Sequence, residues 1–383
     1  MKGEAELGFK KIAWARAHMP LNARIKERFE RERPFAGHLI GAALHLEAKT
    51  ANLILTLRAG GAEMYVIGSN PLSTQDEIAA ALAETNGITV SARHGEPLEE
   101  HAASIDQLLD SSPTLIVEDG GEVIGRIVER GIDRLPRLIG ICEETTTGVE
   151  QLRKLERKGK LPIPAIAVND ARMKYLLDNR YGTGQSTWDA IMRSTNLLIA
   201  GKTVLIIGYG WVGKGLALRA CGLGARVIVT ELDPIKSVEA LMEGHEVASL
   251  NEGISQADIV LTATGKPGIV GKDALERAKD RAILANAGHF GYEIDKEALE
   301  RTALENDEVR PGVRAYRFAD GRTIYLLGEG ELVNLAVADG HPAEIMDISF
   351  SLQALSLEHL AKSGKDLPAR VHRVPEEIER SIA

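Results

Sequence analysis

The sequence predicts an α/β protein made of two doubly wound domains, in which parallel strands alternate with helices. Three observations predict this class. The chain has 383 residues, which is too long for one ordinary hydrophobic core. Short apolar runs alternate with helix-like segments through its first half. A second series of buried-strand patterns begins at Lys202.

The first domain opens with two amphipathic helices, which meet around Met19 and Pro20. Strand patterns then alternate with helical segments, and the strands end in polar residues. Functional side chains are expected at these ends, because open parallel sheets bind ligands at the carboxyl ends of their strands. The patterns are strands at 62–68, 88–93, 114–121, 138–144 and 165–170 and a helix at 74–85.

The second domain contains four buried-strand patterns, at 202–208, 225–232, 257–265 and 281–289. Gly and Pro residues punctuate the chain near 181–182 and again near 340–342. We therefore expect a first domain at 1–181, completed by about 342–383, and a second domain at 182–341. The tail segment 349–364 predicts an amphipathic helix that packs back on the first domain.

The composition narrows the class of protein. A hydrophobic fraction of 44% and a net charge of −9 fit a globular protein whose main partner is not nucleic acid. The only two cysteines, Cys142 and Cys221, encode neither a disulfide framework nor a cysteine zinc site, and we expect no metal. The chain shows no signal-peptide pattern and no run of about 18 apolar residues, so we expect a cytoplasmic protein.

A glycine-rich turn follows the first strand of the second domain and opens a helix. Gly208 permits the tight turn, Gly210 lets the backbone approach a pyrophosphate, and Gly213 lets helix and strand pack closely. Glu231 closes the next strand, where an acid accepts both ribose hydroxyls and repels a 2′-phosphate. This combination predicts a Rossmann domain that binds NAD rather than NADP. The expected contacts are Gly208, Gly210, Trp211, Val212, Gly213, Lys214, Gly215 and Glu231.

Polar clusters follow five predicted strands or turns of the first domain. Each has an ordinary explanation alone, because helix N-caps and turns use the same residues. Five clusters at one rim of one sheet instead indicate a ligand site. They begin at His45, Ser73, Glu118, Glu143 and Asn169.

Several longer motifs then identify a family. The chain resembles S-adenosylhomocysteine hydrolases from about residue 8 to about 375. The motifs are LHLEAKTANL, NPLSTQDEIAAAL, EDGGE, EETTTGV, VNDARMKYLLDNRYGTGQS, GYGWVGKG, VTELDPI, NAGHF, EGELVNL and GHPAEIM, in this order.

This resemblance implies a reaction. Such enzymes use tightly bound NAD to oxidise the 3′-hydroxyl of a nucleosidyl-homocysteine, which acidifies the 4′ C–H and lets homocysteine be eliminated. Water is then added and the ketone is reduced again, so the thioether is cleaved reversibly to nucleoside and L-homocysteine. The resemblance places the nucleoside between two hinged domains and implies a homotetramer.

The resemblance also assigns roles to residues. Lys174 is expected to be the base for oxidation, with a pKa lowered by burial, four residues before Asp178 on one helix face. Catalytic residues are then His45, Asp119, Lys174, Asp178 and His289. Substrate-binding residues are Glu47, Lys49, Ser73, Gln75, Asp119, Glu144, Asn169, Lys174, Asp178 and His341. Further cofactor contacts are Thr145, Thr146, Thr147, Asn179, Thr264, Asn286, Ala287, Gly288, His289, Asn334 and His341.

Three departures from the family pattern bear on function. Glu47 and Lys49 stand where many relatives have Thr and Glu. A lysine that donates to O6 and a glutamate that accepts from N1–H would suit S-inosylhomocysteine. If Lys49 merely pairs with Glu47 or with solvent, the two residues set no preference between the two nucleobases. The chain ends at Ala383, which removes family residues expected to reach a neighbour's NAD, and Gly291 stands where many relatives have Asp.

Two alternatives remain open. A catalytically silent NAD-binding homologue could act as a regulator, although the intact candidate catalytic residues argue against it. A 2-hydroxy-acid dehydrogenase would release its NAD as a cosubstrate, but no motif resembles that class.

Overall fold

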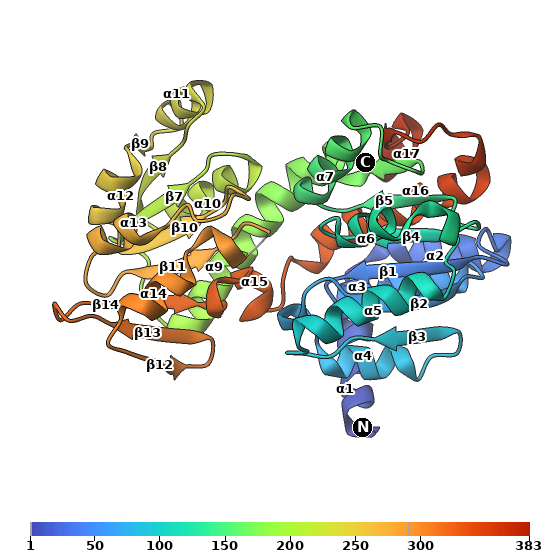
Figure 1. Cartoon of the computed structure of the whole chain (residues 1–383), viewed down its shortest axis with the longest axis horizontal. Coiled ribbons are helices and arrows are strands. Elements are labelled where there is room, and N and C mark those ends of the chain that lie inside the picture. Colours follow the sequence, from blue (N-terminus) through green and yellow to red (C-terminus); the bar gives the residue numbers. More distant parts are fainter. Residues whose placement is uncertain (1, 290) are drawn as a thin grey trace. The chain divides into compact units, whose positions relative to one another are not determined.

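The computed structural model describes residues 2–289 and 291–383 (Figure 1). The chain forms two compact units, the first from Met1–Tyr175 and Ala343–Ala383 and the second from Leu176–Pro342. Each unit is built around one sheet of mainly parallel strands with helices packed on it. The predicted class, an α/β protein with two doubly wound domains, is confirmed.

The first unit contains a parallel sheet of seven strands in the order β15-β6-β5-β4-β1-β2-β3. The strand order reverses between β1 and β4, which are direct neighbours. Their carboxyl ends therefore form the point at which such a sheet binds ligands. The strands are β1 Leu39–Leu44, β2 Glu63–Gly68, β3 Ile88–Ser91, β4 Leu115–Glu118, β5 Gly140–Glu143, β6 Ala165–Ala167 and β15 Val371–Arg373.

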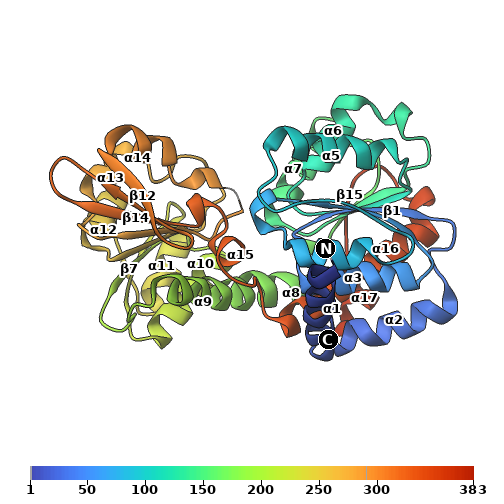
Figure 2. The ribbon, with the colours of Figure 1, turned by 90° about the horizontal axis from the view of Figure 1, so that it is seen from below.

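Helices cover both faces of this sheet (Figure 2). Alternate strand side chains point to opposite faces, so Ile40 and Ala42 pack with α1–α4 and α16, whereas Ala43 packs with α5–α7. The helices are α1 Lys2–Ala17, α2 Pro20–Glu32, α3 Ala48–Ala59, α4 Asp76–Ala83, α5 Leu98–Asp110, α6 Glu122–Arg130, α7 Thr146–Arg157, α8 Arg172–Lys174, α16 Ala343–Ser363 and α17 Glu376–Ile382. Short 3₁₀ turns lie at η1 Pro71–Ser73, η2 Ile132–Arg134, η3 Val168–Asp170 and η7 Gly364–Asp366.

The tail helix α16 differs from the prediction. It was expected to be amphipathic, but consecutive residues from Ser349 to Ala354 are buried, so more than one face is enclosed. Ser349, Ser351, Gln353 and Ser356 are fully buried although they are polar. The sequence pattern misled because polar residues usually mark a solvent-facing surface.

The second unit contains an eight-stranded sheet in the order β12-β13-β14-β11-β10-β7-β8-β9. Its order reverses between β7 and β10, and β12–β14 form an antiparallel extension that the sequence patterns did not predict. The strands are β7 Thr203–Ile207, β8 Arg226–Thr230, β9 Glu246–Val247, β10 Ile259–Thr262, β11 Ile283–Asn286, β12 Glu305–Arg310, β13 Val313–Arg317 and β14 Thr323–Leu327.

The second unit has two separate cores, one on each face of its sheet. Helices α9 and α10 pack with Val204 and Ile206, and helices α12–α14 pack with Leu205 and Ile207. The helices are η4 Tyr175–Gly182, which is a π-helix, α9 Thr183–Thr195, α10 Trp211–Gly222, α11 Pro234–Met242, α12 Leu250–Gln256, α13 Lys272–Arg277, η5 Gly291–Glu293, α14 Lys296–Thr302, η6 Gly328–Gly330 and α15 Val333–Ala336. Within the described residues, no helix combines the length and the apolar character that a membrane span needs.

Candidate active site

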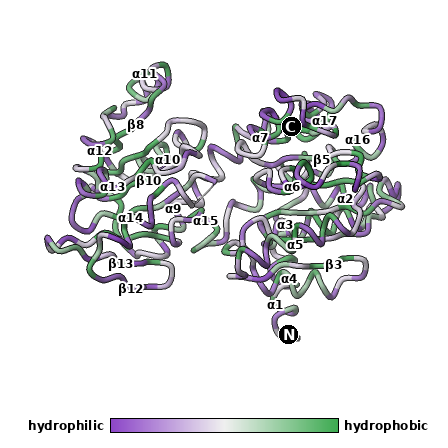
Figure 3. The backbone as a smooth tube through the Cα atoms, in the orientation of Figure 1, coloured by the Kyte–Doolittle hydropathy of each residue, from purple (hydrophilic) through white to green (hydrophobic). Residues whose placement is uncertain are grey.

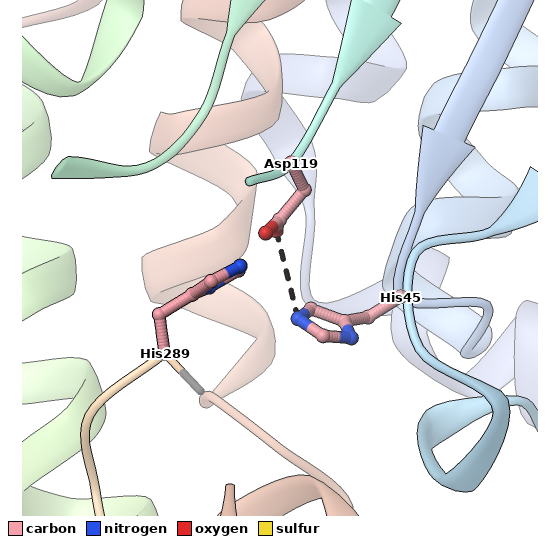
Figure 4. Close-up of side chains that lie close together, drawn as sticks. All are labelled: His45, Asp119 and His289. Atoms are coloured by element: carbon pink, nitrogen blue, oxygen red, sulfur yellow. Dashed lines mark ion pairs between the residues drawn. The ribbon is translucent and has the colours of Figure 1, made fainter. Parts of the chain in front are cut away.

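The first unit brings His45 and Asp119 together at the point where its strand order reverses. His45 follows β1, Asp119 follows β4, and the two strands are neighbours. The Nε2 atom of His45 lies 3.7 Å from Oδ2 of Asp119 (Figure 4). A histidine and a carboxylate at this separation can pass a proton to a ligand held between or beside them.

The hydrogen bonds of Ser73 define the tautomer of His45. The Ser73 hydroxyl donates its only hydrogen to the backbone carbonyl of Asn70, at 2.8 Å. It therefore accepts from Nδ1 of His45, at 2.6 Å. Because Nδ1 carries a proton, Nε2 is the ring nitrogen that can gain or lose one, and it faces Asp119.

A second group surrounds Lys174 at the ends of β5 and β6. The Nζ atom of Lys174 lies 3.4 Å from Oε1 of Glu144 and 3.5 Å from Oδ1 of Asn169. The Asn169 amide donates to the hydroxyl of Thr146, at 3.1 Å. Lys174, Glu144 and Asn169 are all buried, so Glu144 and Asn169, rather than bulk water, offer acceptors to the amine when it is protonated.

Buried Glu143 holds the two turns that carry Asp119 and Glu144. One carboxyl oxygen of Glu143 accepts from Gly120 N at 3.0 Å and from both N and Oγ1 of Thr145 at 2.8 Å. Burial raises the pKa of Glu143 well above its ordinary value. The neighbouring turns are therefore fixed by one internal side chain.

Glu118, at the end of the neighbouring strand β4, is a second buried carboxyl that holds backbone N–H groups, in this case those of α6. It lies opposite Glu143 in the sheet register and accepts from the backbone N–H groups of Val123 and Ile124. Burial raises the pKa of Glu118 to about 8, against these two hydrogen bonds, which lower it. This strand end thus contains two buried carboxyls next to the proposed proton-transfer residue Asp119.

Glu47 and Lys49 form a buried ion pair at the start of α3. Lys49 Nζ lies 2.7 Å from Oε2 of Glu47, and the Glu47 carboxylate also caps the helix by accepting from Lys49 N and Thr50 N. The Lys49–Glu47 pair that the second interpretation expects, in which these residues set no substrate preference, is therefore present. Another predicted substrate residue, Gln75, accepts a hydrogen bond from Lys11 of α1 at 3.3 Å.

The glycine-rich turn of the second unit has the geometry that a pyrophosphate requires. Gly208 has φ +96°, which a side chain would strain, and a Cβ at Gly213 would lie 2.0 Å from the Gly208 carbonyl oxygen. A Cβ at Gly210 would have no atom within 4 Å, so the backbone there is open to a ligand. Gly215 packs on the backbone of Arg180 and cannot carry a side chain without movement.

Trp211, Val212 and Lys214 follow this turn in α10. Val212 packs on the core of the unit, and the Lys214 ammonium lies 4.9 Å from the Trp211 ring centroid. Lys214 also pairs with Glu239 of α11 at 2.6 Å. These residues fix the helix N-terminus that faces the turn.

Glu231 presents its carboxylate beside the turn. It accepts from the backbone N–H groups of Tyr209, Leu232 and Asp233, at 2.7–3.0 Å. Burial acts to raise the pKa of Glu231, but these hydrogen bonds outweigh it and the net pKa is lowered. The group is therefore a carboxylate at neutral pH, as an acceptor of ribose hydroxyls must be.

The ends of β10 and β11 are held by a buried carboxyl. Glu293 accepts from N and Oγ1 of Thr264 and from Gly265 N, and burial raises its pKa. A Cβ at Gly288 would lie 1.6 Å from Glu293, so only glycine fits there. Asn286 then fixes Gly288 by accepting from its N–H at 2.8 Å.

Asp178 and His341 form a pair within the second unit. Nδ1 of His341 lies 3.2 Å from Oδ1 of Asp178, and Nε2 lies 3.1 Å from the hydroxyl of Thr183. The buried Asn334 amide donates to Ser186 Oγ at 3.0 Å. Its Oδ1 has no hydrogen-bond partner within the residues that the structure describes, which leaves an acceptor for a bound group.

The structure also explains Gly291. A Cβ at this position would lie 2.3 Å from Oε1 of Glu331, so a larger residue requires the Glu331 side chain to move. The preceding residue of the NAGHF motif, Phe290, lies outside the described residues.

The predicted site residues thus form separate groups. The first unit brings together His45 with Ser73 and Asp119, Lys174 with Glu144 and Asn169, and Glu47 with Lys49. The second unit brings Asp178 to His341 and Glu231 to the glycine turn. The predictions missed the supporting side chain Glu293, because nothing in a single sequence distinguishes a buried polar residue from an exposed one.

Comparison with known proteins identifies the family. A family model described as "S-adenosyl-L-homocysteine hydrolase, NAD binding domain" matches residues 179–340, and one described as "S-adenosyl-L-homocysteine hydrolase" matches residues 2–136. The chain belongs to the S-adenosyl-L-homocysteine hydrolase family. The predicted resemblance and the predicted NAD cofactor are therefore confirmed.

Relatives with two different names are similarly close to this member of the family. It is 53% identical to "S-inosyl-L-homocysteine hydrolase" of Methanopyrus kandleri, covering 97% of this chain and 88% of that protein. It is 50% identical to "Adenosylhomocysteinase" of Thermotoga maritima, covering 98% and 93%. Among solved structures, a dipicolinate synthase polypeptide of Bacillus halodurans has a TM-score of 0.54 at 14% identity over 85% of this chain and 99% of that one, which shows a shared fold alone.

Proposed function

We propose that this S-adenosyl-L-homocysteine hydrolase family member uses NAD to cleave the thioether of a nucleosidyl-homocysteine, giving a nucleoside and L-homocysteine. One observation carries the proposal: Lys174 is buried between Glu144 and Asn169 in a chain whose residues 179–340 match the family's NAD-binding model. The relatives' names supply the substrate class.

The residues of the second unit fit NAD. The open backbone at Gly210 suits the pyrophosphate, the ionised Glu231 suits the adenosine ribose, and the free Oδ1 of Asn334 suits an amide donor. When bound, NAD would supply reversible oxidation at the 3′ position of the substrate sugar.

Lys174 would take the proton of the 3′-hydroxyl. Glu144 and Asn169 offer acceptors at 3.4 and 3.5 Å, so the ammonium formed by this transfer is stabilised without water. Asn169 is itself oriented by Thr146, which leaves its carbonyl oxygen directed at the lysine. Burial of these three side chains would also limit the access of water to a sugar bound beside them.

His45 and Asp119 would move protons during elimination and water addition. Nδ1 of His45 donates its proton in the hydrogen bond to Ser73, so Nε2 is the ring nitrogen that would accept and release a proton. Glu143 fixes the turn after Asp119 through Gly120, which keeps the carboxylate near that nitrogen.

A release assay separates this proposal from the silent regulatory homologue. The purified protein, supplied with NAD, is incubated with S-adenosyl- and S-inosyl-homocysteine, and free homocysteine is measured. We expect release from at least one compound. Bound NAD with no release from either compound would favour the regulatory role.

We also propose that the inosyl compound is preferred. Lys49 would donate to O6 of hypoxanthine and Glu47 would accept from N1–H, while their mutual pair at 2.7 Å holds both in place. Relatives of both names have similar identities, so overall similarity does not decide the preference.

Finally, we propose a cytoplasmic homo-oligomer, a tetramer by family resemblance. Helix α11 supports association because it carries exposed hydrophobic residues, and Figure 3 shows both hydrophobic and hydrophilic residues in it. Four of its hydrophobic residues are exposed, Ile235 by 78%, Val238 by 53%, Leu241 by 53% and Met242 by 83%, whereas Ala240 packs in the core. Light scattering of the purified protein tests the stoichiometry.

A further inference from the structure

Two side chains from the C-terminal segment of the first unit contact the group around Lys174. Gln353 of α16 is fully buried, and its Nε2 donates to Oε2 of Glu144 at 2.5 Å. The other oxygen of Glu144 lies 3.4 Å from Lys174 Nζ. The carboxylate is therefore held at one oxygen by Gln353 while the other faces the lysine.

The surroundings of Gln353 show that this contact is its main polar interaction. A carboxylate only accepts, so the amide nitrogen must face Glu144. The amide oxygen has no hydrogen-bond partner within the residues that the structure describes, and the neighbouring Leu352, Ala354 and Leu357 are fully buried. An apolar residue would avoid this unsatisfied acceptor, so the donor toward Glu144 accounts for a glutamine here.

Glu379 of α17 holds the backbone next to Lys174. Its Oε1 accepts from the backbone N–H of Met173 at 2.8 Å, although 206 positions separate the two residues. Helix α8 has no side-chain cap of its own at Ala171. Glu379 therefore satisfies an otherwise free N–H in the short helix that carries the lysine.

We infer that Gln353 and Glu379 are positioning residues: one orients Glu144 and the other fixes the backbone at Lys174, so that the lysine meets the 3′-hydroxyl in a reactive geometry. This inference rests on the proposed function. It assigns the C-terminal helices a part in the reaction through contacts within the first unit, without any contact to substrate.

The test compares variants that remove each contact with variants that preserve it. Gln353→Met removes the donor and keeps the shape, and Glu379→Leu removes the acceptor. Glu379→Gln keeps an acceptor oxygen and should behave like wild type. Matched controls are Ser356→Ala, which alters another fully buried polar residue of α16, and Glu377→Leu, which alters an exposed residue of α17.

We expect kcat to fall by roughly 10- to 100-fold in Gln353→Met and in Glu379→Leu, with KM nearly unchanged, because misplacement of a reacting group costs about this much. The controls and Glu379→Gln should keep kcat within about threefold. Amide hydrogen exchange at Met173 should accelerate in Glu379→Leu and not in Glu379→Gln. If Gln353→Met does not fold, Gln353→Asn serves instead, because it keeps the amide but withdraws it from Glu144.

The outcomes separate two failures. An active wild type whose Gln353→Met and Glu379→Leu variants keep kcat would overturn the positioning role alone. The positioning role is equally overturned if KM rises while kcat is kept, or if both control variants lose as much kcat. A wild type that releases no homocysteine would remove the proposed function and, with it, this role.

Discussion

The preference for one nucleobase of the substrate can be tested by replacing Glu47 and Lys49, the two residues proposed to bind that nucleobase. The double variant Glu47→Thr with Lys49→Glu replaces a glutamate acceptor and a lysine donor by a threonine and a glutamate. We expect wild type to have the higher kcat/KM for S-inosylhomocysteine, and the double variant to prefer S-adenosylhomocysteine. The reason is hydrogen-bond polarity, since hypoxanthine presents an acceptor at O6 and adenine presents an amino donor there.

The structure sets the size of this effect. Glu47 and Lys49 are buried, with only 4% and 7% of their surface exposed, so a mismatched base leaves polar groups without water. Each such mismatch costs about 1–3 kcal/mol. Two mismatches at the lower limit give a preference of about 30-fold, and two at about 1.5 kcal/mol each exceed a hundredfold.

The double variant is also the one that should fold. Glu47 caps α3 through Lys49 N and Thr50 N, and threonine is a good N-cap residue. Lys49→Glu alone would place two carboxylates together in a buried site and is expected to lose about 3–5 kcal/mol of stability, as broken buried pairs do.

The assay measures kcat/KM for both thioethers under identical NAD saturation. Glu77→Gln, which alters a partly exposed ion pair with Lys11, serves as a control for a nearby change of charge. Equal or better use of the adenosyl compound by wild type would refute the base-reading argument and leave the family assignment intact.

Three further predictions concern the two units. Lys174→Ala should keep the fold and the NAD content but lose about 10²–10⁴-fold in homocysteine release, the usual contribution of a general base; activity within a few-fold of wild type would exclude that role. Glu231→Ala should weaken NAD binding and relax discrimination against NADP, measured by calorimetry with each dinucleotide; a wild type that binds both equally would contradict the assignment. The free energy of unfolding should fall as the pH rises from about 4.5 to about 8, because the pKa of Glu118 is raised in the folded state and its ionisation favours unfolding. Glu118→Gln should weaken this pH dependence, measured by denaturant titrations at several pH values. A pH dependence of the unfolding free energy that is the same in Glu118→Gln and in wild type would contradict the prediction.

The sequence predicted β2–β8, β10 and β11 because their apolar runs are continuous and end in polar residues, but it did not indicate β1, β9 or β15. It did not predict β12, whose residues Glu305–Arg310 are all exposed and carry no buried face. It also did not predict that residues 175–182 form a π-helix, since the spacing of Lys174 and Asp178 fits an ordinary helix equally well.

The candidate site was predictable to the extent that its residues follow strands or belong to family motifs. Ser73 was expected at the substrate, but its bonds to Asn70 and His45, which define the histidine tautomer, depend on coordinates. Gln353 illustrates what sequence patterns conceal, because a polar residue in a helix normally predicts an exposed face. Its burial and its bond to Glu144 arise from the packing of α16 inside the first unit.

In the proposed reaction the substrate sugar is oxidised transiently while NAD is bound, and Lys174 acts as the base. The most direct test mixes the NAD-loaded protein rapidly with a thioether substrate and follows nicotinamide absorbance and homocysteine release in the same reaction. Reduced nicotinamide should rise before homocysteine appears and then return to its starting level, and Lys174→Ala should slow the rise. Homocysteine release without any reduction of the nicotinamide would contradict this reaction scheme.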